Sequence, residues 1–249
     1  MASVEPDTHQ SPKPIPRPRL LDLFSGTGST AEAFKEQGFE VITLDFNAKY
    51  RPDILVDILD WDYEKAFSPG YFHTIAVSPP CTEYSAAMTC RPRELAKADA
   101  IVERALEVIR YLQPRYWFVE NPRTGMLKDR GLLDGVTYVD VDYCQFCDWG
   151  YQKPTRIWGP MYLKNLKSRV CDQKTCTNLV VRSSGHWGHR RVLGATPQDG
   201  APRVPLEDQY RIPEGLIYYL MGWARLDQDW IKPPVGPAGK TSLKIQRPL

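Results

Sequence analysis

The sequence predicts an α/β fold around a largely parallel sheet, and three observations indicate it. Short apolar runs, each the length of a buried strand, recur at residues 20–24, 74–77 and 116–119. Glycines at 26 and 28 follow the first run, as a tight turn requires. A helical pattern separates the last two runs and places four apolar residues on one face, Ile101, Ala105, Val108 and Leu112. Strands that alternate with helices are typical of a parallel sheet.

The elements near the amino terminus form a strand–helix–strand unit. After the glycine turn, a helix over 30–37 is expected to end at Gly38, because glycine commonly terminates helices. A strand over 40–44 follows and ends on Asp45. We expect a third, short strand that ends at Asp57.

Later elements are expected to complete the sheet and cover it. Residues 136–143 and 155–158 are rich in β-branched and aromatic residues, which favours two further strands whose orientation the pattern leaves open. Residues 213–224 return to a helical pattern.

Changes in composition divide the chain into five segments. The first holds prolines among polar residues and cannot bury enough apolar surface to order itself, so we expect a flexible arm. The chain after residue 160 mixes basic residues, glycine, cysteine and histidine without a period, which predicts a small irregular lobe. The predicted segments are the arm at 1–18, the main α/β domain at 19–160, the small lobe at 161–210, a helical segment at 211–231 that returns to the main domain, and a tail at 232–249.

Composition limits the classes of protein to which the chain can belong. It has no apolar run of 18 residues and no signal-peptide pattern, so we expect a soluble, intracellular monomer without a membrane partner. Its compartment is expected to be the cytoplasm, or the nucleus in a eukaryote. Six cysteines in 249 residues do not form a secreted disulfide framework, and we expect no structural disulfide. The net charge of +2 means that any attraction to phosphate must come from a local basic surface.

The first chemical motif is the glycine turn over 22–29. Glycines let the backbone approach a ligand closely, and the carboxylate of Asp45 at the end of the next strand can hold ribose hydroxyls. Asp57 and Ile58 could supply an acid and an apolar wall to an adenine ring. A plain tight turn and a solvated Asp57 are the alternative interpretations.

Two further motifs follow core strands. Pro79 and Pro80 fix the backbone and present Cys81 at the carboxyl edge of the sheet, where α/β proteins bind ligands. Glu120 and Asn121 follow the next strand in the same way. Each motif alone fits a buried thiol or an ordinary turn. Together they predict a thiol, a carboxylate and a nucleoside-binding loop on one rim.

These motifs, in this order, resemble those of the cytosine-C5 methyltransferase family. The resemblance covers roughly 20–160, includes the run Gln152–Ile157, and continues faintly near 213. It implies a Rossmann-like class I methyltransferase fold, S-adenosylmethionine as cofactor, and transfer of a methyl group to carbon 5 of cytosine through a covalent thiol adduct on a flipped base. DNA is the favoured substrate. RNA methylation and a catalytically silent nucleic-acid or S-adenosylmethionine binding module are the alternatives.

The resemblance also implies roles for individual residues. Catalysis would fall to Cys81 as nucleophile, Glu120 at the ring N3 and amino group, and Arg156 at the cytosine O2. Substrate binding would involve Pro80, Ser85, Asn121 and Gln152. The cofactor would contact Phe24, Ser25, Gly26, Thr27, Gly28, Ser29, Asp45, Phe46, Asp57, Ile58 and Pro79.

The sequence departs from the family pattern in three places. Pro154 stands where the family usually has a second arginine, two residues before Arg156. The small lobe is short for a region that recognises a long site, and the family's late Gly-Asn motif is missing. These departures affect target specificity more than the type of reaction.

Cysteines and histidines in the small lobe are candidate zinc ligands. Cys171, Cys176, His186 and His189 have the ligand types of a tetrahedral zinc site. The alternative is free cysteines and surface histidines, and the sequence alone does not decide between the two. Cys144 and Cys147 are expected to be core thiols. Basic and aromatic residues of the lobe could contact phosphates and bases, among them Lys164, Lys167, Arg169, Arg182, Trp187, Arg190 and Arg191.

Overall fold

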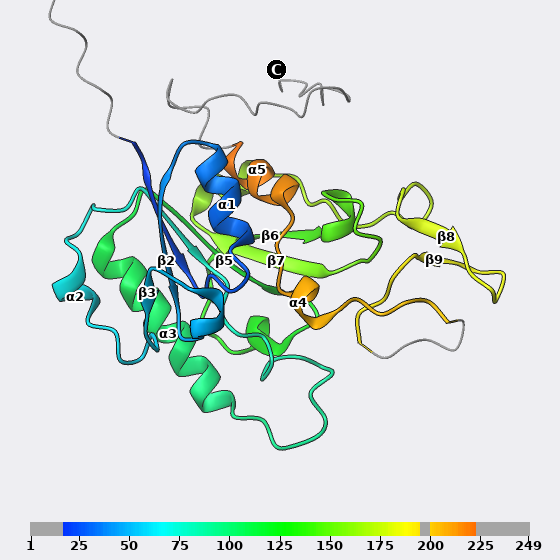
Figure 1. The fold of residues 1–249 in the computed structure, drawn as a ribbon, viewed down its shortest axis with the longest axis horizontal. Coiled ribbons are helices and arrows are strands. Elements are labelled where there is room, and N and C mark those ends of the chain that lie inside the picture. The colour runs from blue at the N-terminus through cyan, green and yellow to red at the C-terminus, as the bar shows by residue number, and fades with distance from the viewer. Residues whose placement is uncertain (1–16, 195–199, 223–249) are drawn as a thin grey trace, which may run out of the picture.

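A seven-stranded sheet organises the chain (Figure 1). The structure is a computed structural model that describes residues 17–194 and 200–222, so most of the predicted arm and the tail lie outside the described residues. The strand order is β3-β2-β1-β4-β5-β7-β6, and β7 runs antiparallel to both of its neighbours while the other pairs are parallel. The strands are β1 (Arg19–Leu23), β2 (Glu40–Asp45), β3 (Ile54–Leu55), β4 (Thr74–Val77), β5 (Tyr116–Pro122), β6 (Thr137–Asp142) and β7 (Pro154–Gly159). The predicted α/β fold with a largely parallel sheet is confirmed.

The topological switch point of the sheet is at β1, with β2 and β3 on one side of it and β4 and β5 on the other. β1 pairs with β2 on one side and with β4 on the other, with Leu23 opposite both Leu44 and Val77. Strands that diverge from such a point leave a crevice at their carboxyl ends, where ligands bind in open α/β sheets. The glycine turn after β1 and the Pro-Pro-Cys turn after β4 therefore lie next to each other, and the Ser78 backbone N–H donates to Leu23 O at 3.2 Å.

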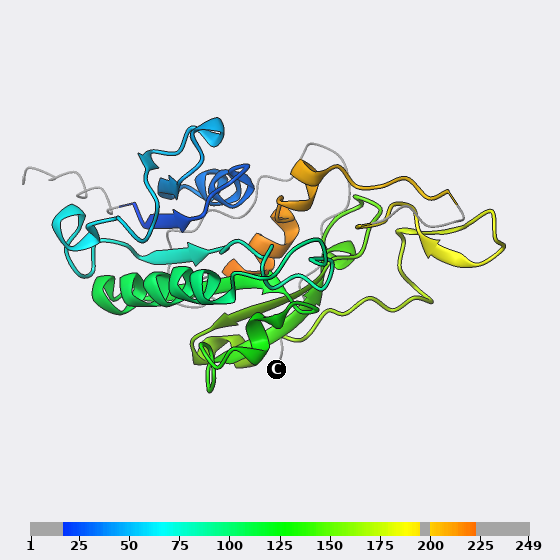
Figure 2. The same cartoon turned by 90° about the horizontal axis from the view of Figure 1, so that it is seen from below.

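Helices cover both faces of the sheet (Figures 1 and 2). On one face α3 packs its apolar stripe, including Val102, Ala105 and Val108, against alternate strand residues such as Leu21 and Ile75. On the other face α1 and α5 lie together over the remaining strand residues. The helices are α1 (Ser29–Glu36), α2 (Tyr63–Ala66), α3 (Leu95–Leu112), α4 (Leu206–Gln209) and α5 (Glu214–Met221), with 3-10 turns at Ala48–Tyr50, Met126–Asp129, Tyr143–Gln145 and Met161–Asn165. None of the helices within the described ranges has both the length and the apolar character needed to cross a bilayer.

A small lobe projects from the end of the sheet (Figures 1 and 2). It contains the two-stranded antiparallel sheet of β8 (Leu179–Val181) and β9 (Trp187–His189). Between residues 166 and 194, all of which the structure describes, Cys176 is the one apolar residue in the buried class. A two-stranded hairpin is marginally stable alone, so this lobe needs support from something other than its own apolar core.

A carboxyl group is buried beneath the first helix. Asp22 of β1 is 1% exposed, and its Oδ2 has no hydrogen-bond partner among the described residues. Burial raises the pKa of Asp22 to about 7, and the charge of Asp45 adds to the shift, while the backbone N–H of Ala31 in the first turn of α1 opposes it. The folded protein therefore holds a proton that the unfolded chain releases at lower pH.

This carboxyl group makes stability depend on pH. Because the folded pKa of Asp22 lies above the unfolded value of 3.8, the free energy of unfolding should fall as the pH rises from about 4 to about 7 and then level off. The total loss is roughly 4 kcal/mol on the scale of ~1.4 kcal/mol per pKa unit. In Asp22→Asn this component should vanish, as measured by urea unfolding at several pH values. The exposed Asp60→Asn variant is the control, and a pH profile of Asp22→Asn identical to that of the unmodified protein would contradict the assignment.

Candidate active site

The glycine turn after β1 adopts a conformation that ordinary residues avoid. Gly26 and Gly28 have φ of 48° and 78°, and Phe24 has φ of 63° although it is not a glycine. A non-glycine residue in this region costs about 1–3 kcal/mol and is most often kept at ligand sites. Asp45 stabilises the turn, because its Oδ2 accepts from the Gly26 N–H at 2.9 Å and its Oδ1 accepts from the Asn47 N–H at 2.8 Å.

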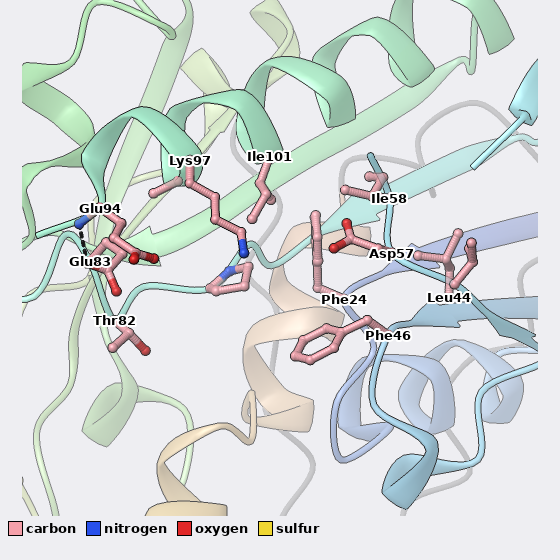
Figure 3. Close-up of a pocket in the computed structure, with 13 residues that line it drawn as sticks. Phe24, Leu44, Phe46, Asp57, Ile58, Thr82, Glu83, Glu94, Lys97 and Ile101 are labelled. Atoms are coloured by element: carbon pink, nitrogen blue, oxygen red, sulfur yellow. Dashed lines mark hydrogen bonds between the residues drawn. The ribbon is translucent and has the colours of Figure 1, made fainter. Parts of the chain in front are cut away.

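A pocket opens at the carboxyl ends of β1 and β2, beside the start of α3 (Figure 3). Its volume is about 220 Å³. Figure 3 shows Asp57 and Ile58 toward one end, Thr82, Glu83 and Glu94 at the other, and the Lys97 side chain reaching in from α3 between them. The predicted residues that line it are Phe24, Phe46, Asp57, Ile58 and Pro80.

One wall of this pocket is provided by α3 and was not predicted from the sequence. Lys97 and Ile101 are four residues apart and so lie on the same face of the helix. The sequence predicts that the two residues share a helix face, but it does not show that this face lies beside the glycine turn. Glu94 and Thr82 also line the pocket and were not predicted.

Other predicted cofactor residues lie around the pocket without lining it. Ser29 accepts a hydrogen bond at Oγ from the Ile212 N–H at 2.9 Å, so it joins α1 to the segment before α5. Pro79 O accepts from Asn121 Nδ2 at 3.1 Å. The buried Thr27 Oγ1 has no partner among the described residues. The remaining predicted positions, Ser25, Gly26, Gly28 and Asp45, form the glycine turn and its support.

Cys81 follows β4 and shares its surroundings with an anion and a cation. Burial raises the pKa of the Cys81 thiol, the charge of Lys153 opposes this shift, and the charge of Glu120 adds to it. Tyr210, which is 45% exposed, also couples electrostatically to Cys81. The structure therefore brings Cys81 and Glu120 together as predicted, and it adds Lys153 and Tyr210.

Glu120 is held at one oxygen. It is 5% exposed, and its Oε1 accepts from Tyr143 Oη at 2.9 Å and lies 3.7 Å from Lys153 Nζ. Lys153 Nζ also donates to Tyr143 Oη at 3.4 Å and to Gln209 O at 3.1 Å. Within the described part of the chain no donor reaches Oε2 of Glu120 at hydrogen-bond distance. One carboxylate oxygen is thus fixed and the other remains available.

Arg156 lies on the opposite face of the sheet from Glu120. The pairing places Glu120 opposite Ile157 and Asn121 opposite Arg156, so the two charged side chains leave the sheet in opposite directions. Arg156 donates to both carboxylate oxygens of Asp140, at 2.7 and 2.9 Å, and its guanidinium lies 3.7 Å from the centre of the Tyr138 ring. Its predicted contact with the base stays a prediction.

Two predicted substrate residues are likewise engaged elsewhere in this structure. Gln152 Nε2 donates to Asp142 Oδ2 at 2.8 Å, on the same face as Arg156. Ser85 Oγ accepts from the Ala87 N–H at 3.2 Å within the loop that follows Cys81.

The loop between Cys81 and α3 is braced by Glu83. This carboxylate forms an ion pair with Arg91 and accepts from the Glu94 N–H at 2.7 Å. Arg93 Nη1 donates to the carbonyl oxygens of Glu83 and Ser85 at 2.8 and 2.7 Å. Arg91 and Arg93 therefore both shape this loop.

The predicted zinc candidates are only partly brought together. Cys171, Cys176 and His189 cluster, and the fourth member is Cys144. His186 is exposed and outside the cluster, while Cys147 donates to Tyr143 O at 3.2 Å. The structure therefore does not place His186 with the other three candidates. Cys144, which was expected to be a core thiol, is buried and lies in the cluster. All six cysteines are free thiols.

Comparisons with known proteins identify the family. No protein-family profile matches the sequence. The chain is 36% identical over 220 residues to a protein of Frog virus 3 (isolate Goorha) named "Probable DNA (cytosine-5)-methyltransferase", which covers 82% of this chain and 98% of the viral protein.

Solved structures show more distant likeness. The Entamoeba histolytica methyltransferase EhMeth is 13% identical with a TM-score of 0.44, over 62% of this chain and 57% of that one. Spodoptera frugiperda DNMT2 is 16% identical with a TM-score of 0.37, over 57% of this chain and 49% of that one. The identity to the viral protein extends over nearly all of that protein and most of this sequence, and on that ground the chain belongs to the DNA (cytosine-5)-methyltransferase family.

Proposed function

We propose that this protein transfers a methyl group from S-adenosylmethionine to carbon 5 of cytosine in DNA, with Cys81 as the nucleophile. The observation that carries the proposal is the position of Cys81, beside Glu120 and next to a pocket at the switch point of the sheet. The relationship to the viral protein, whose name states the same reaction and polymer, supports it.

The pocket has the chemistry that S-adenosylmethionine requires. Phe24 and Ile58 offer apolar surface to an adenine ring, and the Asp57 carboxylate can accept from its amino group. Asp45 retains lone pairs for ribose hydroxyls beside the two backbone N–H groups that it already binds. The buried Thr27 Oγ1, which lacks a described partner, is a further polar group at this rim. When bound, the cofactor supplies an electrophilic methyl group on its sulfonium sulfur.

Cys81 activates the base. Its thiolate adds to carbon 6 of cytosine, which raises the electron density at carbon 5 so that this atom can take the methyl group. Loss of the proton from carbon 5 then re-forms the ring double bond and expels the thiolate. Burial disfavours the thiolate of Cys81, whereas the charge of the neighbouring Lys153 ammonium favours it, as does a backbone hydrogen bond at Cys81 itself.

Glu120 orients the base and responds to charge on the ring. With Oε1 held by Tyr143 and near Lys153, Oε2 is left to interact with the N3 and amino edge of a cytosine. In the proposed step a proton shared between Oε2 and N3 offsets the negative charge that develops on the ring as the thiolate adds. A stacked base cannot reach Cys81, so a duplex substrate must flip its cytosine into the site.

Methyl transfer tests the proposal directly. Labelled methyl from S-adenosylmethionine should appear as 5-methylcytosine in mixed-sequence DNA, and Cys81→Ser should reduce the rate by at least about 10³-fold because the covalent step is lost. Cys90→Ser is the matched control, since Cys90 is the exposed cysteine of the same loop. A second arm uses tRNA as the acceptor.

Trapping on DNA that contains 5-fluorocytosine separates the outcomes of that experiment. An active Cys81 should leave a stable adduct that denaturing gels detect, and Cys90→Ser should form it as well. Methylation of tRNA alone would move the substrate to RNA. Cofactor binding without labelling or adduct formation on either polymer would leave a binding role and overturn the proposed reaction.

The Lys153 ammonium should set the reactivity of Cys81 even without a substrate. In Lys153→Met the pKa of Cys81 should rise further, so that alkylation of Cys81 by iodoacetamide slows at pH 8 and its pH profile moves to higher pH. Arg156→Met is the matched control, because Arg156 is paired with Asp140 on the other face. Peptide mass spectrometry follows Cys81 alone. Equal profiles for the two variants would rule out this role of Lys153.

The cofactor pocket has its own paired test. Asp57→Ala should weaken S-adenosylmethionine binding by roughly tenfold, measured by calorimetry, because a hydrogen bond from the adenine amino group to a charged acceptor is lost. Asp60→Ala, three residues along the chain and outside the pocket lining, should bind as the unmodified protein does. Equal binding by the two variants would place the cofactor elsewhere.

A further inference from the structure

Four potential metal ligands meet where the small lobe joins the main sheet. Cys144 lies in the turn after β6, Cys171 and Cys176 lie in the connection to β8, and His189 ends β9. One ligand atom from each of the four lies within 4.8 Å of every other. These residues are separated by up to 45 positions in the sequence, so the fold and not a local motif assembles them.

The distances within this cluster match a tetrahedral zinc ion. His189 Nε2 lies 3.6 Å from both Cys171 Sγ and Cys176 Sγ. A tetrahedral site with Zn–S of about 2.3 Å and Zn–N of about 2.0–2.1 Å requires S···N separations of about 3.6 Å. A hydrogen bond between the His189 ring and one thiol would not by itself place both sulfur atoms at the same distance from Nε2.

The cluster is enclosed and its backbone is held in place. Cys144, Cys176 and His189 are each at most 9% exposed. Asp142 Oδ2 accepts from the Cys171 N–H at 2.7 Å. Arg182 Nη2 donates to His189 O at 2.8 Å, which brings a cation beside a site whose three thiolates would outnumber the charge of a divalent ion.

The side chain of Asn178 ties the two sides of the cluster together. Its Nδ2 donates to Cys144 O at 3.0 Å and to Cys147 O at 2.9 Å, while its Oδ1 accepts from the Gly150 N–H and from Arg190 Nη2, both at 3.0 Å. All four hydrogen-bonding positions of the amide are used. This support resembles the outer shell that orients metal ligands in proteins.

We propose that Cys144, Cys171, Cys176 and His189 bind a structural zinc ion that fastens the small lobe to the main sheet. With four protein ligands the site has no open position for a substrate, which distinguishes a structural from a catalytic zinc. The small lobe buries almost no apolar side chain of its own, so a bound ion would supply stability that its core cannot. The proposal does not depend on the chemistry proposed for Cys81.

The location of the ion links it to the active site through one peptide bond. Cys144 directly follows Tyr143, whose hydroxyl holds Glu120. An ion at this point fixes the backbone from which Tyr143 projects. Zinc is therefore expected to order both the lobe and one wall of the active site.

Metal analysis of the full chain tests the proposal. The purified protein should contain about one zinc ion per chain, and Cys171→Ser and His189→Asn should lose most of it. Cys171 is half-buried while the other three ligands are buried, so its substitution should disturb packing least. Cys147→Ser and His186→Asn are the matched controls and should keep the metal, because neither residue belongs to the cluster.

Cobalt gives a readout that does not depend on activity. After removal of zinc, Co²⁺ should produce the visible and thiolate charge-transfer bands of a tetrahedral sulfur-rich site at one equivalent. Hydrogen exchange in residues 169–190 should become faster without metal, while β1 and β4 stay protected. No metal and no cobalt spectrum in the unmodified chain, or retention of metal by Cys171→Ser with loss in Cys147→Ser, would overturn the proposal.

Discussion

The parallel pairing of β1 with β4 is the constraint on which the rest of the site depends. The hydrogen bond from Ser78 to Leu23 continues this pairing beyond the strand ends and holds the two turns together. Phe24 has a strained backbone conformation immediately after β1, and Cys81 lies three residues after Ser78. Neither the pocket nor the thiol could be placed on its own, because each is built from the end of a strand whose position the other strand fixes.

Charge balance governs the interior of the active site. A buried carboxylate without a partner is costly, and Glu120 avoids this cost through Tyr143 and Lys153. Lys153 is itself supported by the carbonyl of Gln209, which comes from the segment before α5. The segment before α5 therefore contributes to the position of one ammonium group, although Lys153 and Gln209 are 56 residues apart in the sequence.

Much of the fold and part of the site could be predicted from the sequence. Strand runs and glycine turns report local structure, and the motifs around Cys81 and Glu120 each follow a strand of one parallel sheet, so their common edge could be inferred. Lys153 could not be placed in the same way. It lies one residue before β7 and continues the alternation of Thr155 and Ile157, but its position beside Glu120 depends on the register between β5 and β7, which the sequence alone does not specify.

The candidate zinc ligands also show what sequence can and cannot predict. Residue type alone pointed to Cys171, Cys176 and His189. That Cys144 and not His186 joins them depends on how the lobe folds back on β6. His186 lies in the turn between β8 and β9 and points away with it, as its exposure shows. Sequence proximity grouped His186 with the other three candidates, whereas tertiary packing brings Cys144 to them instead.

The antiparallel direction of β7 has a consequence for how this site can change. Because β7 begins where β4 and β5 end, its first residues, and not its last, lie at the active edge. A single-residue insertion or deletion between Lys153 and Ile157 would turn every preceding side chain to the other face of the sheet. The spacing of these positions is therefore under stricter constraint than their identities, and length variation in this region has to be absorbed before Lys153, in the connection that carries Cys144.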